Sequence, residues 1–211
     1  MKLFILFNKI FNLLLYQKIY ILFFIFYINK MNKILLSILL VFVSCGNLRK
    51  TADWNFDTFH KELVNRHNEL RKKHSAGALT VLKDLTTLCQ KTVDNCKKLG
   101  TLQHGNLNMD DGTRVGQNLF LSSWAPTGTE VADDWYSENV DYDYSTGKAK
   151  NNNAVVGHFT QLVWKGSKQI GCAVAVGPWL SYKNSYYVGC DYLPPGNYIG
   201  QEVKNVSPPT S

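Results

Sequence analysis

The sequence predicts an α+β domain over residues 53–206, and three observations support this fold class. Apolar residues recur at helical spacing in two long segments, 57–74 and 84–100. Two later segments, 168–176 and 184–193, have the composition of β-strands separated by a short connection. Helices and strands follow one another without regular βαβ alternation, which favours α+β over a parallel α/β fold.

The two long segments are predicted to be amphipathic helices that bury one face. The first begins at Asp57 and ends near Lys73 and His74, and it carries Phe59, Leu63 and Leu70 at helical spacing. The second begins at Asp84 as its N-cap and ends at Gly100 as its C-cap. Its apolar stripe includes Cys89 and Cys96, so both are expected to face the core.

The middle of the domain is predicted to hold shorter elements. Residues 118–122 are expected to form a buried strand, and residues 141–153 a loop. Thr127 and Glu130 have the spacing of a capping box, which opens a third helix with Trp135 in the core. A short helix is expected over residues 155–164. The tail after Val203 is rich in Pro and Ser, and residues 207–211 are expected to be disordered.

The first 46 residues are predicted to be a leader outside the domain. Met31-Asn32-Lys33 followed by the apolar run 34–43 has the basic start and short apolar region of a secretory signal. This run is shorter than the roughly 20 apolar residues that span a bilayer. Residues 44–46 are small and suit cleavage. The protein is therefore expected to be secreted, with a mature chain that begins close to Asn47.

Three interpretations stay open for the leader. Met31 is the functional start, or residues 10–28 form a signal-anchor that holds the protein on a membrane, although Lys18 would be costly in lipid. In addition, residues 43–45 resemble a lipoprotein processing site, which would leave Cys45 lipidated.

The charge of the chain argues against nucleic acid as a partner. Five of its 23 Lys and Arg residues lie in the first 46 positions, which contain no Asp or Glu, so the remainder carries 18 basic and 16 acidic residues. A nucleic-acid interface needs a retained basic face. The cluster formed by Arg66, His67, Arg71, Lys72, Lys73 and His74 is expected to be a solvated helix face that could touch anionic lipid.

The four cysteines after the leader are predicted to form one disulfide. Cys89 and Cys96 are seven residues apart on a helix, a rise of about 10.5 Å, which exceeds the roughly 7 Å limit for a bridge. Cys172 and Cys190 lie on the two hairpin strands, and pairing them places Gly177 opposite Ser185. We therefore expect a Cys172–Cys190 disulfide, with Cys89 and Cys96 reduced.

Two motifs in the second half resemble those of the CAP superfamily, which holds cysteine-rich secretory proteins, venom antigens and plant pathogenesis-related proteins. They are GHFTQLVW over residues 157–164 and YYVGCDYLPPGN over residues 186–197. The segments 65–69 and 130–138 are similar to the Golgi-associated plant pathogenesis-related subgroup. The resemblance implies a three-layer α-β-α sandwich. That subgroup can be myristoylated, but Asn32 follows Met31 and the glycine needed for this modification is absent.

The resemblance also implies a central cleft lined by two histidines and two acidic residues. The matching positions are His104, Gln117, Glu138 and His158. Gln117 departs from the pattern because the family carries Glu there, so one carboxylate is missing. His104 and His158 are expected to bind Zn²⁺ weakly, since imidazole nitrogen suits zinc and two protein ligands are fewer than usual. The alternative is that the histidines only hold the cleft walls together.

Two classes of function remain open. The resemblance implies a binding protein that takes a sterol or other lipid and contacts membranes or partner proteins. Tyr136, Tyr142 and Tyr144 would suit such a surface, unless they only cover Trp135. The alternative is a hydrolase, such as a protease, that uses a metal or Glu138 as base in the same cleft. No nucleophile elbow, HExxH or Cys-His signature supports this alternative.

Overall fold

The computed structural model describes residues 54–210 of the 211-residue chain. The predicted leader, its cleavage site and all three interpretations of it lie outside the described residues. Among residues 54–210, no helix is both long enough and apolar enough to cross a membrane.

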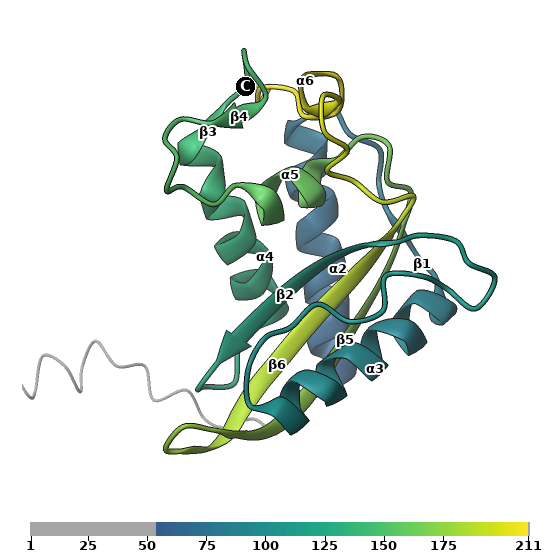
Figure 1. Ribbon diagram of the computed structural model, residues 1–211, viewed down its shortest axis with the longest axis vertical. Helices are drawn as coiled ribbons and strands as arrows, with labels where there is room; N and C mark the ends of the chain where they lie inside the picture. Colours follow the sequence, from purple (N-terminus) through teal and green to yellow (C-terminus); the bar gives the residue numbers. More distant parts are fainter. Residues whose placement is uncertain (1–53, 211) are drawn as a thin grey trace, which may run out of the picture. The chain divides into compact units, whose positions relative to one another are not determined.

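A four-stranded sheet forms the middle layer of the domain (Figure 1). Its strands lie in the order β1-β5-β6-β2, with β1 parallel to β5 and the other neighbours antiparallel. The strands are Thr80–Val81 (β1), Gln169–Trp179 (β5), Tyr182–Leu193 (β6) and Gly116–Ser122 (β2). The central strands β5 and β6 are largely buried, because helices cover both faces of the sheet.

One helix packs on one face of the sheet and three pack on the other (Figure 1). The first face carries α3 (Lys83–Leu99), and the second carries α2 (Phe56–Lys73), α4 (Gly128–Ser137) and α5 (Gly157–Val163). This arrangement confirms the expected α+β class and the α-β-α sandwich.

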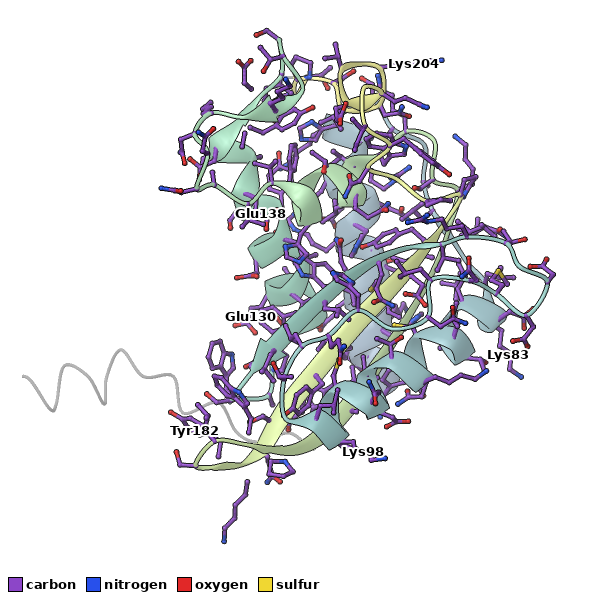
Figure 2. All side chains as sticks on the ribbon, viewed as in Figure 1. Lys83, Lys98, Glu130, Glu138, Tyr182 and Lys204 are labelled. Atoms are coloured by element: carbon purple, nitrogen blue, oxygen red, sulfur yellow. A yellow bond between two sulfur atoms is a disulfide. The ribbon has the colours of Figure 1, made fainter. Side chains whose placement is uncertain are left out.

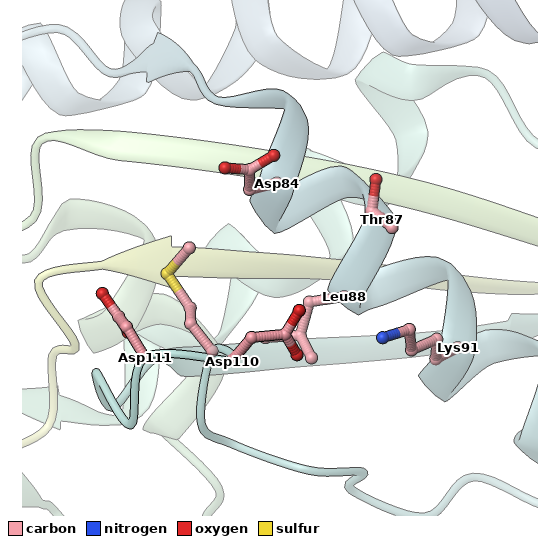
Figure 3. Close-up of a pocket in the computed structure, with 7 residues that line it drawn as sticks. Asp84, Thr87, Leu88, Lys91, Asp110 and Asp111 are labelled. Carbon is pink, nitrogen blue, oxygen red and sulfur yellow. The ribbon is translucent and has the colours of Figure 1, made fainter.

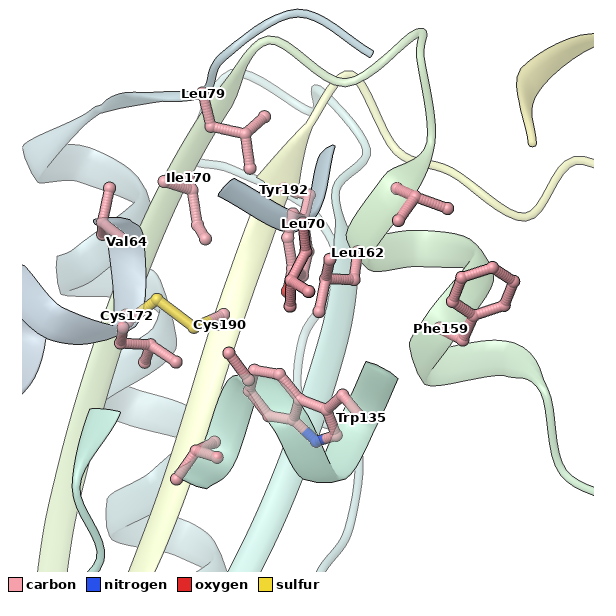
Figure 4. Close-up of a cluster of buried hydrophobic side chains, with 14 of the residues drawn as sticks. Val64, Leu70, Leu79, Trp135, Phe159, Leu162, Ile170, Cys172, Cys190 and Tyr192 are labelled. Atoms are coloured by element: carbon pink, nitrogen blue, oxygen red, sulfur yellow. A yellow bond between two sulfur atoms is a disulfide. The ribbon is translucent and has the colours of Figure 1, made fainter. Parts of the chain in front are cut away.

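Each face of the sheet has its own apolar core. Figure 4 shows Leu70 of α2, Trp135 of α4 and Leu162 of α5 beside the Cys172–Cys190 disulfide. On the opposite face, Cys89, Val93 and Cys96 of α3 pack against the sheet residues Ala173, Ala175 and Tyr187. Burial of a large apolar side chain contributes about 1.5–3 kcal/mol, so these two clusters hold the three layers together.

The helix ends follow from local hydrogen bonding, with one difference from expectation. Helix α2 begins after Asn55, whose side chain accepts the Thr58 N–H at 2.9 Å. Helix α3 begins earlier than expected, after Leu82 rather than Asp84, because the Leu82 N–H bonds the Ile170 carbonyl at 2.9 Å and keeps this residue extended. The predicted C-cap is confirmed, since Gly100 has φ of +68°.

The predicted capping box is present in full at the start of α4. The Thr127 hydroxyl accepts the Glu130 N–H at 3.1 Å, and the Glu130 carboxylate accepts the Thr127 N–H at 2.8 Å. A short 3₁₀ helix, η1 (Glu138–Asp141), follows α4. The loop expected over 141–153 contains a small hairpin of β3 (Tyr142–Asp143) and β4 (Lys148–Ala149).

The β5–β6 hairpin has the predicted register. Cys172 lies opposite Cys190 with their Cα atoms 4.1 Å apart, and the two form a disulfide, while Cys89 and Cys96 are free and buried. The strands continue further than expected, because Trp179 pairs with Tyr182 beyond a β-bulge and their rings stack.

The tail is ordered where disorder was expected. Residues Glu202–Asn205 form helix α6, and Val206 is buried. The Ser207 carbonyl bonds His74 Nδ1 at 2.6 Å, and the Thr210 N–H donates to the Lys73 carbonyl at 2.7 Å. These contacts hold residues 207–210 against the end of α2.

The prediction that the basic cluster of α2 forms a solvated face is wrong for three of its residues. His67, Arg71 and His74 are fully buried. Arg71 alone donates hydrogen bonds to four backbone carbonyls, so its charge serves the interior of the domain instead of a surface partner.

Candidate functional site

Glu138 and His158 form a tight pair where the end of α4 meets the start of α5. Glu138 follows the last residue of α4, and Figure 2 shows it at one end of this helix with Glu130 at the other. Its Oε1 lies 2.6 Å from His158 Nδ1. Its Oε2 accepts the backbone N–H groups of His158 and Phe159 at 2.9 and 3.0 Å, at the start of α5. Glu138 therefore fixes both the imidazole and the helix that carries it.

The ring of His158 is also held from its face. The Trp135 ring stacks on it at 6.3 Å between centroids and 17° between planes. The Trp135 indole N–H donates to the Leu119 carbonyl at 3.1 Å, which anchors the indole to β2. A carboxylate acceptor at Nδ1 favours the neutral tautomer that carries the proton there and leaves Nε2 as the basic nitrogen.

Gln117 and His104 form the second pair, on the side of the sheet. The Gln117 Oε1 accepts the Gly105 backbone N–H at 3.2 Å and lies 3.0 Å from His104 Nδ1. The Gln117 amide N–H₂ donates to Asp191 Oδ1 at 2.8 Å and to Thr92 Oγ1 at 3.3 Å. His104 is exposed, whereas the amide that supports it is half-buried.

The four expected residues are thus arranged as two pairs that come from four segments. Asn118, the neighbour of Gln117 on β2, donates to the His158 carbonyl at 3.0 Å and links the strand to α5. The convergence of both pairs on a single ligand stays a prediction.

Asp191 is the residue beside this site that the sequence analysis missed. It lies directly opposite Gln117 in the β2–β6 pairing and is fully buried. Burial raises the pKa of its carboxyl to about 7, although the hydrogen bond from Gln117 acts in the opposite direction. Its position next to Cys190 in the sequence placed it on the hairpin strand. The pairing of this strand with β2, which brings Asp191 beside Gln117, could not be derived from the sequence.

An apolar hollow lies along the same elements as the two pairs. Its volume is about 430 Å³. The residues that line it come from the segment after α3, from β2 and its end, and from α4: Leu102, Leu119, Phe120, Leu121, Trp124, Glu130 and Asp134. Trp124 is 58% exposed, which is unusual for so large an apolar side chain.

The tyrosines for which a ligand surface and a structural role both stayed open pack against the core. Tyr142 is 1% exposed, and the rings of Tyr136, Tyr142 and Tyr144 all contact Phe159. They belong to the core around α5, as does Trp135, which was expected there.

A second pocket, of about 240 Å³, lies between α3 and the loop before β2 (Figure 3). It is lined by Asp84, Thr87, Leu88 and Lys91 of α3 and by Asp110 and Asp111 of the loop. Its lining combines three carboxylates with one lysine and includes none of the four expected site residues.

The nitrogen and oxygen donors of the four expected residues can be tested against the expected zinc ion. Each histidine has its Nδ1 engaged and can offer Nε2, which is the usual arrangement of an oriented zinc ligand. Both oxygens of Glu138 are already hydrogen-bonded, so this residue suits orientation and not ligation. Within residues 54–210, no three His, Cys, Asp or Glu side chains are grouped to hold a metal ion. The residues therefore suit at most a two-histidine site.

Comparison with known proteins defines the family. Residues 64–192 match the model of the cysteine-rich secretory protein family, CAP, so the chain belongs to this family. Cysteine-rich secretory protein 2 of Homo sapiens is 40% identical over 148 residues, which are 67% of this chain and 58% of the relative. Cysteine-rich secretory protein 3 of Equus caballus is 38% identical over the same shares of both chains.

The solved structures agree with the fold. The venom allergen-like protein 4 of Schistosoma mansoni matches with a TM-score of 0.54 and 22% identity, over 72% of this chain and 94% of that protein. The chain spans only 58% of the length of the two secretory relatives, so their remaining parts have no counterpart in the match. Membership of the Golgi-associated subgroup stays a prediction.

Proposed function

We propose that this chain is a secreted CAP-domain protein that binds a sterol or another lipid and contacts membranes or partner proteins. The apolar hollow beside the histidine pairs carries the proposal. Its volume of about 430 Å³ lies within the range of small-ligand sites, about 300–1,000 Å³. The names of the relatives as secretory proteins, together with the predicted leader, support secretion.

The lining of the hollow suits an amphiphilic ligand. Leu119, Phe120 and Leu121 give an apolar wall along β2, and the exposed Trp124 indole offers a flat apolar face. Asp134 of α4 supplies a carboxylate at the same hollow, where it can accept a hydrogen bond from a hydroxyl group of the ligand. A rigid ring system with one polar end would bury its apolar body against β2.

One experiment tests secretion and ligand binding together. The full chain is expressed in a secretory host and recovered from the medium, its N-terminus is sequenced, and its bound lipids are identified by mass spectrometry. We expect a start close to Asn47 and a co-purified sterol or other lipid. Recovery of a membrane-bound form that retains residues 10–28 would establish the anchor alternative.

The hollow itself is tested with a fluorescent sterol analogue. Trp124→Ala should weaken binding about fivefold or more, since truncation of an aromatic anchor commonly costs above about 1 kcal/mol. Tyr198→Ala is the matched control, because Tyr198 is 46% exposed and does not line the hollow. Equal affinity of wild type and Trp124→Ala would place the ligand elsewhere.

The histidine pairs support a second, weaker capacity, the binding of Zn²⁺ through His104 and His158. The observation in its favour is that both rings have Nδ1 engaged and can offer Nε2. His158→Ala should abolish zinc binding measured by titration calorimetry at neutral pH. Equal zinc binding by wild type and His158→Ala would assign both histidines to the walls of the cleft.

The hydrolase alternative would require this ion or Glu138 to activate water, and Glu138 already accepts three hydrogen bonds.

A further inference from the structure

Asp191 presents an unusual combination of burial and hydrogen bonding. The whole residue is 0% exposed, and its carboxyl oxygen Oδ2 has no hydrogen-bond partner among the described residues. Its Oδ1 accepts a single hydrogen bond from a side chain, the amide of Gln117 at 2.8 Å. An incompletely paired buried carboxyl group costs free energy, so its retention behind the cleft calls for an explanation in terms of what it does.

A chain of hydrogen bonds leads from Asp191 to His104. Gln117 stands between Asp191 on one side and His104 on the other. The Gly105 N–H can only donate, so the oxygen of the Gln117 amide faces Gly105 and His104, while its nitrogen faces Asp191. The oxygen can only accept, which requires His104 Nδ1 to carry the proton.

We propose that Asp191 is a positioning residue of the cleft, which acts through the Gln117 amide to hold His104 as the Nδ1–H tautomer with Nε2 as its basic nitrogen. An acceptor at position 191 keeps the amide nitrogen turned inward. When Asp191 is ionised, its negative charge also polarises the amide and strengthens the amide oxygen as an acceptor. Asp191 touches no ligand in this role, and it acts only through Gln117.

This role accounts for the departure of position 117 from the family pattern. The carboxylate absent at Gln117 is present one strand away, at the residue paired with it in the sheet. The site therefore retains an acid behind His104, but the acid is buried and an amide separates it from the imidazole. The other titratable groups that interact with Asp191 are the Cys89 thiol of α3 and the neighbouring Tyr192 hydroxyl, both fully buried.

The tautomer of His104 gives a direct, metal-free test. Long-range ¹H–¹⁵N correlation spectra of the imidazole should show mainly the Nδ1–H form in the wild type. Asp191→Leu keeps the branching of the side chain, with two larger methyl groups in place of the carboxyl oxygens, and removes the acceptor. His104 should then shift to the Nε2–H form that free histidine prefers. Asp191→Asn, which retains one acceptor oxygen, should fall between the two. An unchanged tautomer in a folded Asp191→Leu variant would overturn the proposal.

Ser185→Ala is the matched control. Ser185 lies on the same strand, is also fully buried, and its hydroxyl likewise lacks a partner among the described residues. Because it pairs with Gly177 and not with Gln117, its replacement should leave the tautomer of His104 unchanged. A shift as large as that of Asp191→Leu would mean that the tautomer reports general disturbance of the strand.

An exchange of the acid and the amide keeps the test informative if Asp191→Leu does not fold. Gln117→Glu alone places two carboxyl groups against each other and should lower Tm. Adding Asp191→Asn to Gln117→Glu should restore Tm, since the amide introduced on β6 can then donate to the carboxylate introduced on β2. Failure of the double variant to recover stability would show that the two positions do not act as a pair. Neither readout involves lipid or zinc, so both stand apart from the proposed function.

Discussion

At the scale of single residues, the polar side chains of α2 serve the interior. Arg71 donates from Nη1 to the carbonyls of Leu162 and Trp164, both at 2.9 Å, and thereby satisfies carbonyl groups at the end of α5. His67 lies 2.7 Å through Nδ1 from the Leu63 carbonyl and 2.8 Å through Nε2 from the Tyr192 hydroxyl. A neutral imidazole that donates from Nδ1 and accepts at Nε2 satisfies both contacts.

His67 should make the fold sensitive to acid. Burial lowers its pKa from 6.5 to about 4. The unfolded chain therefore takes up a proton below about pH 6.5 while the folded protein does not, so stability falls as the pH drops from 6.5 towards 4. The full difference corresponds to about 3 kcal/mol. Measured by urea unfolding at each pH, the stability of His67→Gln should rise relative to that of the wild type as the pH falls across this range.

The effect of His67 on acid stability needs a control variant, and it must be separated from the opposite effect of Asp191. His104→Gln removes an exposed histidine and should retain the acid sensitivity of the wild type. Asp191 acts in the opposite sense, because its raised pKa of about 7 makes the folded state gain stability as the pH falls from 7 towards 4. This contribution is common to all three proteins. Parallel pH profiles of wild type and His67→Gln would contradict the assignment to His67.

At the scale of elements, the close approach of α2 and α4 sets the position of Glu138. A Cβ atom built on Gly128, the first residue of α4, would lie 2.2 Å from the Phe59 carbonyl oxygen and 2.3 Å from the Leu63 nitrogen. Both atoms belong to the backbone of α2 and cannot turn aside. Glycine at this position therefore allows the two helices to pack directly, and α4 then delivers Glu138 to α5.

Gly128→Ala should destabilise the domain by about 1–3 kcal/mol, the usual cost of overpacking. The direction of this change in stability is informative. On helix propensity alone, alanine is more favourable than glycine by about 1 kcal/mol and would stabilise the domain. Gly77→Ala is the matched control, since a Cβ there meets nothing within 4 Å. Chemical denaturation of both variants gives the comparison, and equal stabilities would contradict the direct packing of α4 on α2.

At the scale of the whole molecule, the disulfide and the free cysteines lie on different layers. Cys172 and Cys190 join the two central strands, whereas Cys89 and Cys96 belong to α3 and lie in the core between this helix and the sheet. Burial raises the pKa of the Cys89 thiol well above its usual range, which keeps this thiol protonated and unreactive.

Thiol counting should therefore find two free thiols in the denatured, unreduced mature protein, and a third only if Cys45 is retained. The double variant Cys172→Ala/Cys190→Ala should lose about 3 kcal/mol of stability, the value typical of a loop of about this length. The matched double variant Cys89→Ala/Cys96→Ala should give no free thiols while it retains the bridge. A count of zero for the wild type would contradict the helical separation of Cys89 and Cys96.

The sequence by itself determined the elements that rest on local signals. Helical periodicity located α2 and α3, the capping box located α4, and strand register gave the Cys172–Cys190 bridge, because each depends on residues close together in the chain or on one hairpin. Motif matches gave the two histidines and Glu138. The partners of those residues required the tertiary structure. Only the packing of β2 beside β6 places Asp191 behind Gln117, and only the docking of α2 buries His67 and Arg71. The burial of α2 and the pairing of β2 with β6 depend on contacts between segments far apart in the chain, and no local pattern in the sequence encodes these contacts.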